Sequence, residues 1–397
     1  ENTASMTAIV LDALSGEQMY DENDILAAFD AEGNVRGIAL LLYPVPFGPN
    51  EGTGLYEMQI RGDGGGDAIS FKYYDASADE VLDSGTGYTF VVDDIIGDVV
   101  VPHEISVGAV TLSIDIASGW NWFSLNVEGD MSIGSVMGSL TSTAGDFIKS
   151  QSSSSTYYGE ENGWYGGLEE FGVTGMYKFD SANDDLLVFS GAPVDPASTP
   201  IGLASGWNWL GFTPQHDGPI GDALASATTT AGDFIKNQAA SSTYYGEENG
   251  WYGGLDVMAP TEGYMLDVAA SSTLTYPNFS AGDAMAREKV DRQLPVAISN
   301  WDVDYHDFEF NGHITMSIDG REDSHGDYIA VFVDDECRGI AERMYFPFGD
   351  SYMYSLMVYS NDIEDEELRF KYYDSENGEI VAYAETMNFT SDMIIGD

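Results

Sequence analysis

The stretch TYYGEENGWYGGL occurs at Thr156–Leu168 and again, unchanged, at Thr243–Leu255. Each copy lies within a longer block of 26 residues, and the two blocks differ at only three positions. The same offset of 87 residues aligns SGWNW at Ser118–Trp122 with SGWNW at Ser205–Trp209. Self-similarity at one fixed offset without gaps is typical of a tandem duplication. The sequence therefore predicts one folding unit that is present twice.

A second similarity joins the two ends of the chain. Five motifs, D-x-L/I-A-A/V-F, RGIA, PFG, FKYYD and IIGD, recur in the same order. They lie first at residues 24–30, 36–39, 46–48, 71–75 and 95–98 and then at residues 327–333, 338–341, 347–349, 370–374 and 394–397. We expect four modules in the order A, B, B, A. Their predicted bounds are A1 (1–107), B1 (108–192), B2 (193–280), a linker (281–294) and A2 (295–397).

The A modules have the pattern of β-sandwiches. Short apolar or alternating segments, such as Met6–Leu11 and Leu55–Ile60, are separated by turns rich in Gly, Asp and Asn. FKYYD runs directly into DSENG at 374–378, where Asn-Gly supplies the positive φ angles of a hairpin turn.

The B modules have a mixed pattern. Alternating apolar residues follow GWNW and predict a strand, and a further set falls at the spacing of one helical face: Ile133, Val136, Met137 and Leu140. We therefore expect a mainly β chain in which two β-sandwich modules flank two tandem small α+β repeats.

Composition narrows the possible partners. The chain has 397 residues, 14 basic against 67 acidic, and a formal net charge of −53. Phosphate binding needs clustered Lys and Arg, so general affinity for nucleic acid or an anionic membrane is excluded, and no apolar run is long enough for membrane insertion. A start at Glu1 without an initiator Met, together with high Gly, Ser and Thr, fits an exported protein at the cell surface or in a matrix.

These motifs carry a resemblance. The A pattern, with WDV at 301–303, RGIA and FKYYD, and the B pattern, with GWNW, GDFIK and GWYGGL, resemble repeat modules of large secreted and cell-surface proteins of Bacteroidota-type bacteria. The resemblance implies an extracellular, modular and non-enzymatic part. It brings no catalytic residues with it, and we expect no enzymatic activity.

The two A copies differ at their ends. A2 is preceded by residues 295–310, which show strand-like alternation, whereas A1 lacks this leading segment. A1 instead continues past IIGD into VVVPHEI at 99–105. A sandwich without an edge strand can accept one from another chain, which predicts a head-to-tail homopolymer built by strand addition. The alternative is that Glu1 marks a cleavage site and that A1 is complete without the extra segment.

Calcium is the candidate cofactor, because it takes several oxygen ligands from acidic loops. The candidate ligands lie in both A modules, although none matches an EF-hand loop: Asp21, Asp24, Asp30, Asp323, Asp327, Asp334 and Asp335.

Aromatic residues of the repeats could stack on sugar rings, which makes a polysaccharide a candidate partner. The candidate glycan-binding residues are Trp120, Trp122, Trp164, Tyr165, Trp207, Trp209, Trp251 and Tyr252. The alternative is that these tryptophans pack the small B cores. Two sequons, at Asn278 and Asn388, are candidate glycosylation sites. The favoured function is a structural subunit of an extracellular fibre, sheath or matrix, and the second is a glycan-binding adhesive protein.

Overall fold

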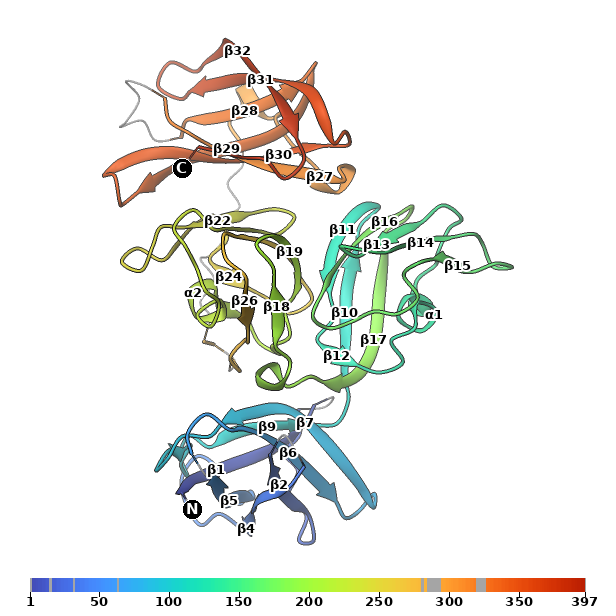
Figure 1. Ribbon diagram of the computed structural model, residues 1–397, viewed down its shortest axis with the longest axis vertical. Coiled ribbons are helices and arrows are strands. Elements are labelled where there is room, and N and C mark those ends of the chain that lie inside the picture. The colour runs from blue at the N-terminus through green and yellow to red at the C-terminus, as the bar shows by residue number, and fades with distance from the viewer. Residues whose placement is uncertain are drawn as a thin grey trace.

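The computed structural model describes residues 2–13, 16–30, 33–62, 64–279, 282–283, 294–318 and 326–396. The chain is mainly β, as the sequence predicts, and its described helices span only three or four residues each. In Figure 1 the strands of A2 lie at the top, those of B1 and B2 lie side by side in the middle, and those of A1 lie at the bottom. Most of the expected linker falls outside the described residues.

A1 is one sheet that closes on itself. Its strands are β1 (Asn2–Asp12), β2 (Ile25–Phe29), β3 (Val35–Ile38), β4 (Leu40–Leu42), β5 (Leu55–Gly62), β6 (Ala68–Asp75), β7 (Glu80–Thr89), β8 (Ile95–Ile96) and β9 (His103–Val107). The order is β2-β6-β7-β9-β1-β5, and the consecutive strands β3 and β4 join β2 to β5. β8 and β9 pair with β1 in parallel, and the other pairs are antiparallel.

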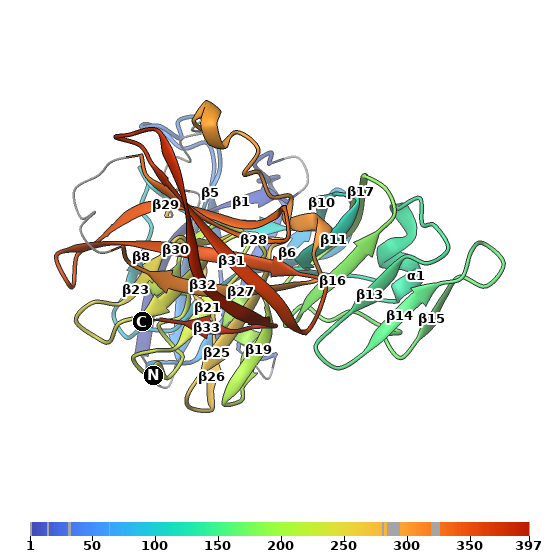
Figure 2. The same cartoon turned by 90° about the horizontal axis from the view of Figure 1, so that it is seen from above.

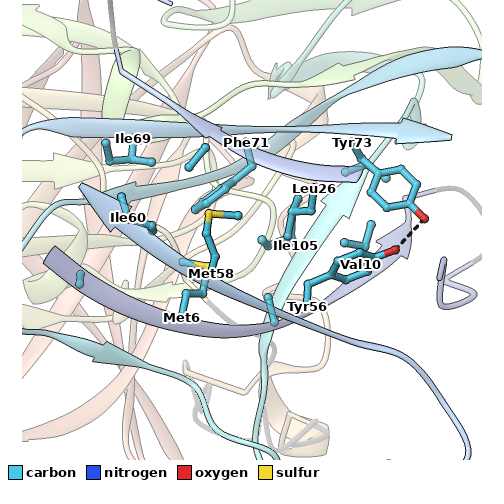
Figure 3. Close-up of a cluster of buried hydrophobic side chains, with 14 of the residues drawn as sticks. Met6, Val10, Leu26, Tyr56, Met58, Ile60, Ile69, Phe71, Tyr73 and Ile105 are labelled. Atoms are coloured by element: carbon cyan, nitrogen blue, oxygen red, sulfur yellow. Dashed lines mark hydrogen bonds between the residues drawn. The ribbon is translucent and has the colours of Figure 1, made fainter. Parts of the chain in front are cut away.

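The A1 core is formed by alternate residues of these strands. Along β1 the buried side chains are Ala4, Met6, Ala8 and Val10, which follow the period of two expected for a strand with one face inside. Figure 3 shows Met6 and Val10 of β1 facing side chains from β2, β5, β6 and β9 across the interior. β9 therefore belongs to the core of the module.

B1 and B2 are built alike, as the duplication predicts. B1 contains β10 (Val110–Ile116), β11 (Gly119–Ser124), β12 (Val127–Glu128), α1 (Ile133–Val136), η1 (Met137–Ser139), β13 (Phe147–Lys149), β14 (Ser154–Tyr157), β15 (Trp164–Gly166), β16 (Met176–Ser181) and β17 (Asp185–Pro193). B2 contains η2 (Pro196–Ser198), β18 (Ile201–Leu203), β19 (Gly206–Gly211), β20 (Gly218–Pro219), α2 (Ile220–Ala223), β21 (Phe234–Lys236), β22 (Ser241–Tyr244), β23 (Trp251–Gly253), β24 (Val257–Met258), β25 (Gly263–Val268) and β26 (Ser272–Leu274). Their main sheets have the equivalent orders β11-β16-β13-β14-β15 and β19-β25-β21-β22-β23.

The helical face expected in B1 forms only one α turn followed by one 3-10 turn. Ser132 caps the turn by accepting a hydrogen bond from the Ser135 N–H, and Val136 and Met137 are buried in the core. Gly134 and Gly138 lie inside this segment, and glycine is a poor helix former, so packing holds the turn where propensity is weak.

A2 repeats the topology of A1 but does not close. Its elements are η3 (Val296–Ile298), η4 (Tyr305–Asp307), β27 (Phe310–Met316), β28 (Tyr328–Val333), β29 (Glu336–Phe346), β30 (Ser351–Ser360), β31 (Glu364–Asp374), β32 (Glu379–Thr390) and β33 (Ile394–Ile395). The order is β32-β31-β28-β29-β30-β27-β33. In the part of A2 that the structure describes, no strand joins β32 to β27, whereas β9 joins the equivalent strands β7 and β1 in A1.

The segment that precedes β27 is not a strand, so the strand-like alternation at residues 295–310 was misleading. It forms η3, η4 and irregular chain, and its apolar residues pack on the outer face of the β28 sheet, with the Trp301 ring 5.6 Å from that of Phe332. The equivalent outer face of A1 has no such cover among the described residues. Its exposed apolar side chains include Ile25, Val35 and Ile38.

Candidate functional site

A tight turn leads into each of the strands β11 and β19, and the WNW residues lie in the strands themselves. In B1 the Asn121 side chain accepts from the Ala117 N–H and donates to the carbonyls of Ala117 and Gly119. Asn208 makes the equivalent bonds in B2. Gly119 has a φ of 95°, and a Cβ there would clash with the carbonyl of His306 from A2. The motif SGWNW is therefore explained by a turn that Asn clamps and that Gly permits.

The tryptophans that follow these turns lie between the two repeats. Trp122 is buried in a cluster with Met176 and Met265, and Trp207 and Trp209 pack against that cluster. We call this contact the repeat joint. Figure 2, seen from above, places β11 and β16 of B1 beside β19 and β25 of B2.

Two glutamines exchange the same hydrogen bonds across the repeat joint. Gln238 of B2 accepts from the Trp122 N–H at 3.0 Å and donates to the Trp120 carbonyl at 2.7 Å. Gln151, the equivalent residue of B1, makes the same two bonds with the equivalent tryptophans of B2, at 3.0 and 2.8 Å. Each glutamine therefore satisfies the free backbone groups of the facing strand.

A second pair of bonds is also exchanged. The Ser124 N–H donates to the Thr261 carbonyl at 2.8 Å, and the Gly211 N–H donates to the Thr174 carbonyl at 3.0 Å. The offset of 87 residues relates Ser124 to Gly211 and Thr174 to Thr261. The repeat joint thus has an approximate two-fold symmetry, in which each repeat contributes the same surface.

Lys178 breaks this symmetry at the centre of the joint. Its Nζ lies 4.0 Å from the centroid of the Trp122 ring and 4.8 Å from that of Trp209, and 2% of the residue is exposed. The equivalent residue in B2 is Met265. Burial lowers the pKa of Lys178 well below its ordinary value. The two indole faces stabilise the cation, and among the described residues no carboxylate lies within 4 Å of it.

A2 is held against both repeats by equivalent lysines. Lys149 of B1 lies over the Trp120 ring at 5.1 Å and forms an ion pair with Glu309. Lys236 of B2 lies over Trp207 at 4.8 Å and pairs with Asp392 at 2.7 Å. Burial lowers the pKa of Lys236, and the charge of Asp392 opposes that effect.

Further polar bonds tie A2 to the glutamine of B2. Asn311 and Tyr359 both donate to the Gln238 carbonyl, at 3.2 and 3.1 Å. His306 Nδ1 lies 2.6 Å from the Trp120 carbonyl. The backbone carbonyls of Trp120 and Gln238 therefore take part in contacts that join B1, B2 and A2.

A cleft of about 490 Å³ opens where B1, B2 and A2 meet. Glu262 lies at its wall and accepts hydrogen bonds from the Asn237 amide and the Tyr264 hydroxyl, both at 2.9 Å. The residues that line the cleft include Asp115, Trp122, Asn237, Glu262, Tyr305 and His306, so hydrogen-bond donors and acceptors and aromatic residues are among them.

The candidate glycan-binding residues do not form one surface. Trp120, Trp122, Trp207 and Trp209 lie in the repeat joint. Trp164 and Trp251 pack on the tyrosines of the neighbouring strands, Tyr157 and Tyr244. Tyr252 packs on Phe346 and Phe348 of A2 and donates to the Tyr345 carbonyl, whereas its equivalent Tyr165 is 77% exposed.

Two of the candidate calcium ligands of A1, Asp24 and Asp30, form bonds to other residues of the same module. Asp24 accepts from the Tyr73 hydroxyl and from the backbone N–H groups of Asp21 and Ala76. Asp30 pairs with Arg36 at 2.8 Å. Burial raises the pKa of Asp30, but hydrogen bonds from Asn34 and Arg36 outweigh that effect and lower it. Asp21 is exposed.

The candidate ligands of A2 follow the same plan. Asp327 is buried and accepts from the Tyr372 hydroxyl and from the Ser375 N–H and Oγ. Asp334 and Asp335 form the turn between β28 and β29, and Asp323 lies outside the described residues. Within the described ranges no group of three or more His, Cys, Asp or Glu could hold a metal ion.

The two sequons differ in accessibility. The Asn278 amide donates to the Gly87 carbonyl of A1 at 2.9 Å, so this side chain helps to join A1 to B2. Asn388 lies exposed on β32. A glycan at Asn278 has to replace that bond, whereas one at Asn388 meets no such cost.

Sequence reasoning missed the residues that organise the joint, which are Gln151, Gln238 and Lys178. A usable signal was present, because three of only six lysines lie in the repeats, at Lys149, Lys178 and Lys236. In so acidic a chain, lysines placed in apolar strands indicate specific contacts.

Comparison with known proteins adds little. No family model matches the chain, and no curated protein matches it. Among solved structures, the Bacillus anthracis TIE protein aligns over 99% of this chain and 67% of its own, at 8% identity and a TM-score of 0.15. In the part of the chain that the structure describes, no helix has the length and apolar character needed to cross a membrane.

Proposed function

We propose that the chain is a structural subunit of an extracellular fibre, sheath or matrix. The observation that carries this proposal is the repeat joint, in which Gln151 and Gln238 bind reciprocally while A2 caps both repeats. Such a joint resists bending because rotation of one repeat breaks bonds on both sides. Four tryptophans of the repeats, Trp120, Trp122, Trp207 and Trp209, are used for this contact, which supports a load-bearing role.

Charge supports the same role. A net charge of −53 keeps the particle soluble and repels copies that approach without a specific contact. Calcium fits this proposal as a counter-ion that screens neighbouring acidic surfaces, since three of the candidate carboxylates, those of Asp24, Asp30 and Asp327, are engaged in bonds within their own modules. Head-to-tail assembly of identical chains remains part of the proposal.

Microscopy of native material tests it directly. Antibodies against the full chain should label extracellular fibres or sheath at regular intervals. Label confined to the cell interior, or an isolated native protein that stays monomeric at high concentration with and without calcium, would contradict it. Small-angle scattering of the full chain should show one rigid particle, and a Gln151→Ala/Gln238→Ala variant should show a broader distribution of sizes.

The cleft at the three-module junction favours a second candidate, glycan binding. Its lining includes carboxylate and amide groups at Glu262 and Asn237 and the aromatic residue Tyr305, a combination suited to sugar hydroxyls. A glycan array with the full chain and an Asp115→Ala variant tests it, because Asp115 is exposed and lies outside the joint. A signal that needs Asp115 would favour binding, and its absence would favour the structural role.

A further inference from the structure

The aromatic loop of B2, between β22 and β23, packs on A2. Tyr245 and Tyr252 flank this loop, and their rings lie between 5.0 and 5.8 Å from those of Phe346 and Phe348. The Tyr252 hydroxyl also donates to the Tyr345 carbonyl. These A2 residues form the tip of the hairpin between β29 and β30, which contains the PFG motif and which we call the PFG tip. A loop of the duplicated B module therefore binds the PFG tip of an A module.

The same loop in B1 is exposed. Tyr158 and Tyr165 are the equivalents of Tyr245 and Tyr252, and they are 56% and 77% exposed. Their ring centroids lie 6.4 Å apart. Figure 2 places β15, which carries Tyr165, at the outer end of B1, away from the strands of A1 and A2. Neighbouring exposed aromatic rings of this kind mark a surface that can bind a partner.

The loop has one conformation in both repeats. The Tyr158 N–H donates to the Gly163 carbonyl at 2.9 Å. The Tyr245 N–H makes the equivalent bond to the Gly250 carbonyl at 2.8 Å. The glycine that follows each of these tyrosines has a φ of 89°. The exposed loop of B1 therefore already has the shape in which its copy binds a PFG tip, so docking requires little loss of conformational freedom.

A1 carries a second PFG tip, at residues 43–48. RGIA precedes both tips at the same distance and aligns Tyr43 with Tyr345. Tyr43 and Phe47, the phenylalanine of the motif, are 58% and 65% exposed. A1 has two residues before the motif where A2 has Phe346, so the aromatic pair of this tip is Tyr43 and Phe47. One loop and one tip are thus in contact within the chain, and the other loop and the other tip are both exposed.

We propose that the B1 loop of one chain binds the PFG tip of A1 in a second copy of the chain. Tyr158 and Tyr165 pack on Tyr43 and Phe47 of that copy, in the way that the B2 loop packs on A2. The two surfaces differ, so each chain can bind one neighbour through its loop and another through its tip. This inference rests on the proposed function and specifies the contact by which identical chains join head to tail.

Charge opposes this contact at low ionic strength. Glu160 and Glu161 lie exposed at the end of the B1 loop, and each chain carries a net charge of −53. Their counterparts Glu247 and Glu248 are exposed although the B2 loop is docked, so the contact leaves these carboxylates in water. Salt screens the repulsion between copies, and association should therefore strengthen as the sodium chloride concentration rises.

Two single variants of the full chain test the proposal. The loop variant is Tyr165→Asp and the tip variant is Phe47→Asp, and Val296→Asp is the matched control because it adds the same charge at an exposed apolar residue outside both surfaces. All three should melt close to the native chain, since each replaced side chain is exposed. Sedimentation velocity of the native chain, each variant and an equimolar mixture of the loop and tip variants is measured over a range of protein concentrations, at low and high sodium chloride.

We expect the native chain and the control to form larger oligomers as their concentration rises, and each variant alone to associate about tenfold or more weakly. The mixture should form a dimer and grow no further. The intact loop of the tip variant binds the intact tip of the loop variant, and the two surfaces that remain both carry Asp.

The other outcomes separate this contact from the proposed function. Either variant that assembles like the native chain, or a mixture that stays monomeric while the native chain assembles, would overturn the contact and leave assembly through another surface. An equal loss of association in the control would assign the effect to added charge and would also overturn the contact. A native chain that stays monomeric at every protein and salt concentration would contradict both the contact and the proposed assembly.

Discussion

Lys178 and Met265 stand opposite equivalent tryptophans in the two repeats: Lys178 is paired with Trp122 across β11 and β16, and Met265 is paired with Trp209 across β19 and β25. The joint therefore contains one buried ammonium and one thioether at positions related by its approximate symmetry. Two B1 repeats that met in this way would bury two lysines together. The asymmetry favours the pairing of B1 with B2 over B1 with B1.

Replacement of Lys178 tests the cost of this buried charge. Lys178→Met should raise the free energy of unfolding by about 1–3 kcal/mol, because an apolar residue of similar size removes the desolvation of the ammonium. Met265→Lys should lower it, because a second cation enters the same cluster. Thermal and urea unfolding of both variants measure the effect, and a stabilising Met265→Lys would refute this account.

The two glutamines form a matched pair of substitutions. Gln238 is buried and joins three modules, whereas Gln151 is exposed. Gln238→Ala should cost about 1–3 kcal/mol because it leaves buried backbone groups of Trp120 and Trp122 without partners, and Gln151→Ala should cost less. Hydrogen exchange of the Trp122 and Trp209 amides gives a local readout. Equal costs would contradict the difference in burial.

His313 predicts a specific pH dependence. Burial, with a smaller contribution from the charge of Lys236, lowers the pKa of His313 from 6.5 to about 4. At this site the unfolded chain therefore binds a proton first as the pH falls, so the contribution of His313 to stability is constant above pH 6.5, declines between 6.5 and 4, and levels off below. His313→Gln should reduce the loss between pH 7 and pH 5 by about 2 kcal/mol. Urea unfolding at both pH values measures it, and identical losses would contradict the shift.

A comparison of divalent cations distinguishes calcium that binds at a specific site from calcium that only screens the acidic surface. Calcium and magnesium at equal concentration should raise the melting temperature alike, because each screens the repulsion among 67 acidic residues. Sodium chloride at high concentration should reproduce much of the effect. Calcium that acts at micromolar concentration, where magnesium has no effect, would instead show a specific site.

The mainly β fold, the duplication and the shared plan of the two end modules could be predicted from the sequence. These follow from local rules: the alternation of apolar residues in β1, the Gly, Asp and Asn turns between the strands, and one offset that aligns the two repeats. The same rules were wrong for residues 295–310, whose apolar residues pack on the face of a sheet and do not form a strand. They were also wrong for the extent of the B1 helix, which has a single α turn.

The roles of the conspicuous aromatic residues became visible in the folded chain. Trp122 and Trp209 look alike in a sequence whether they bind sugar or pack a joint, because the partner strand comes from the other repeat. The open side of A2 was equally invisible, since the strand pairing that leaves Ile318 and Phe370 half-buried joins segments far apart in the chain. Contacts between distant segments depend on how the modules fold and dock, and no local pattern encodes them.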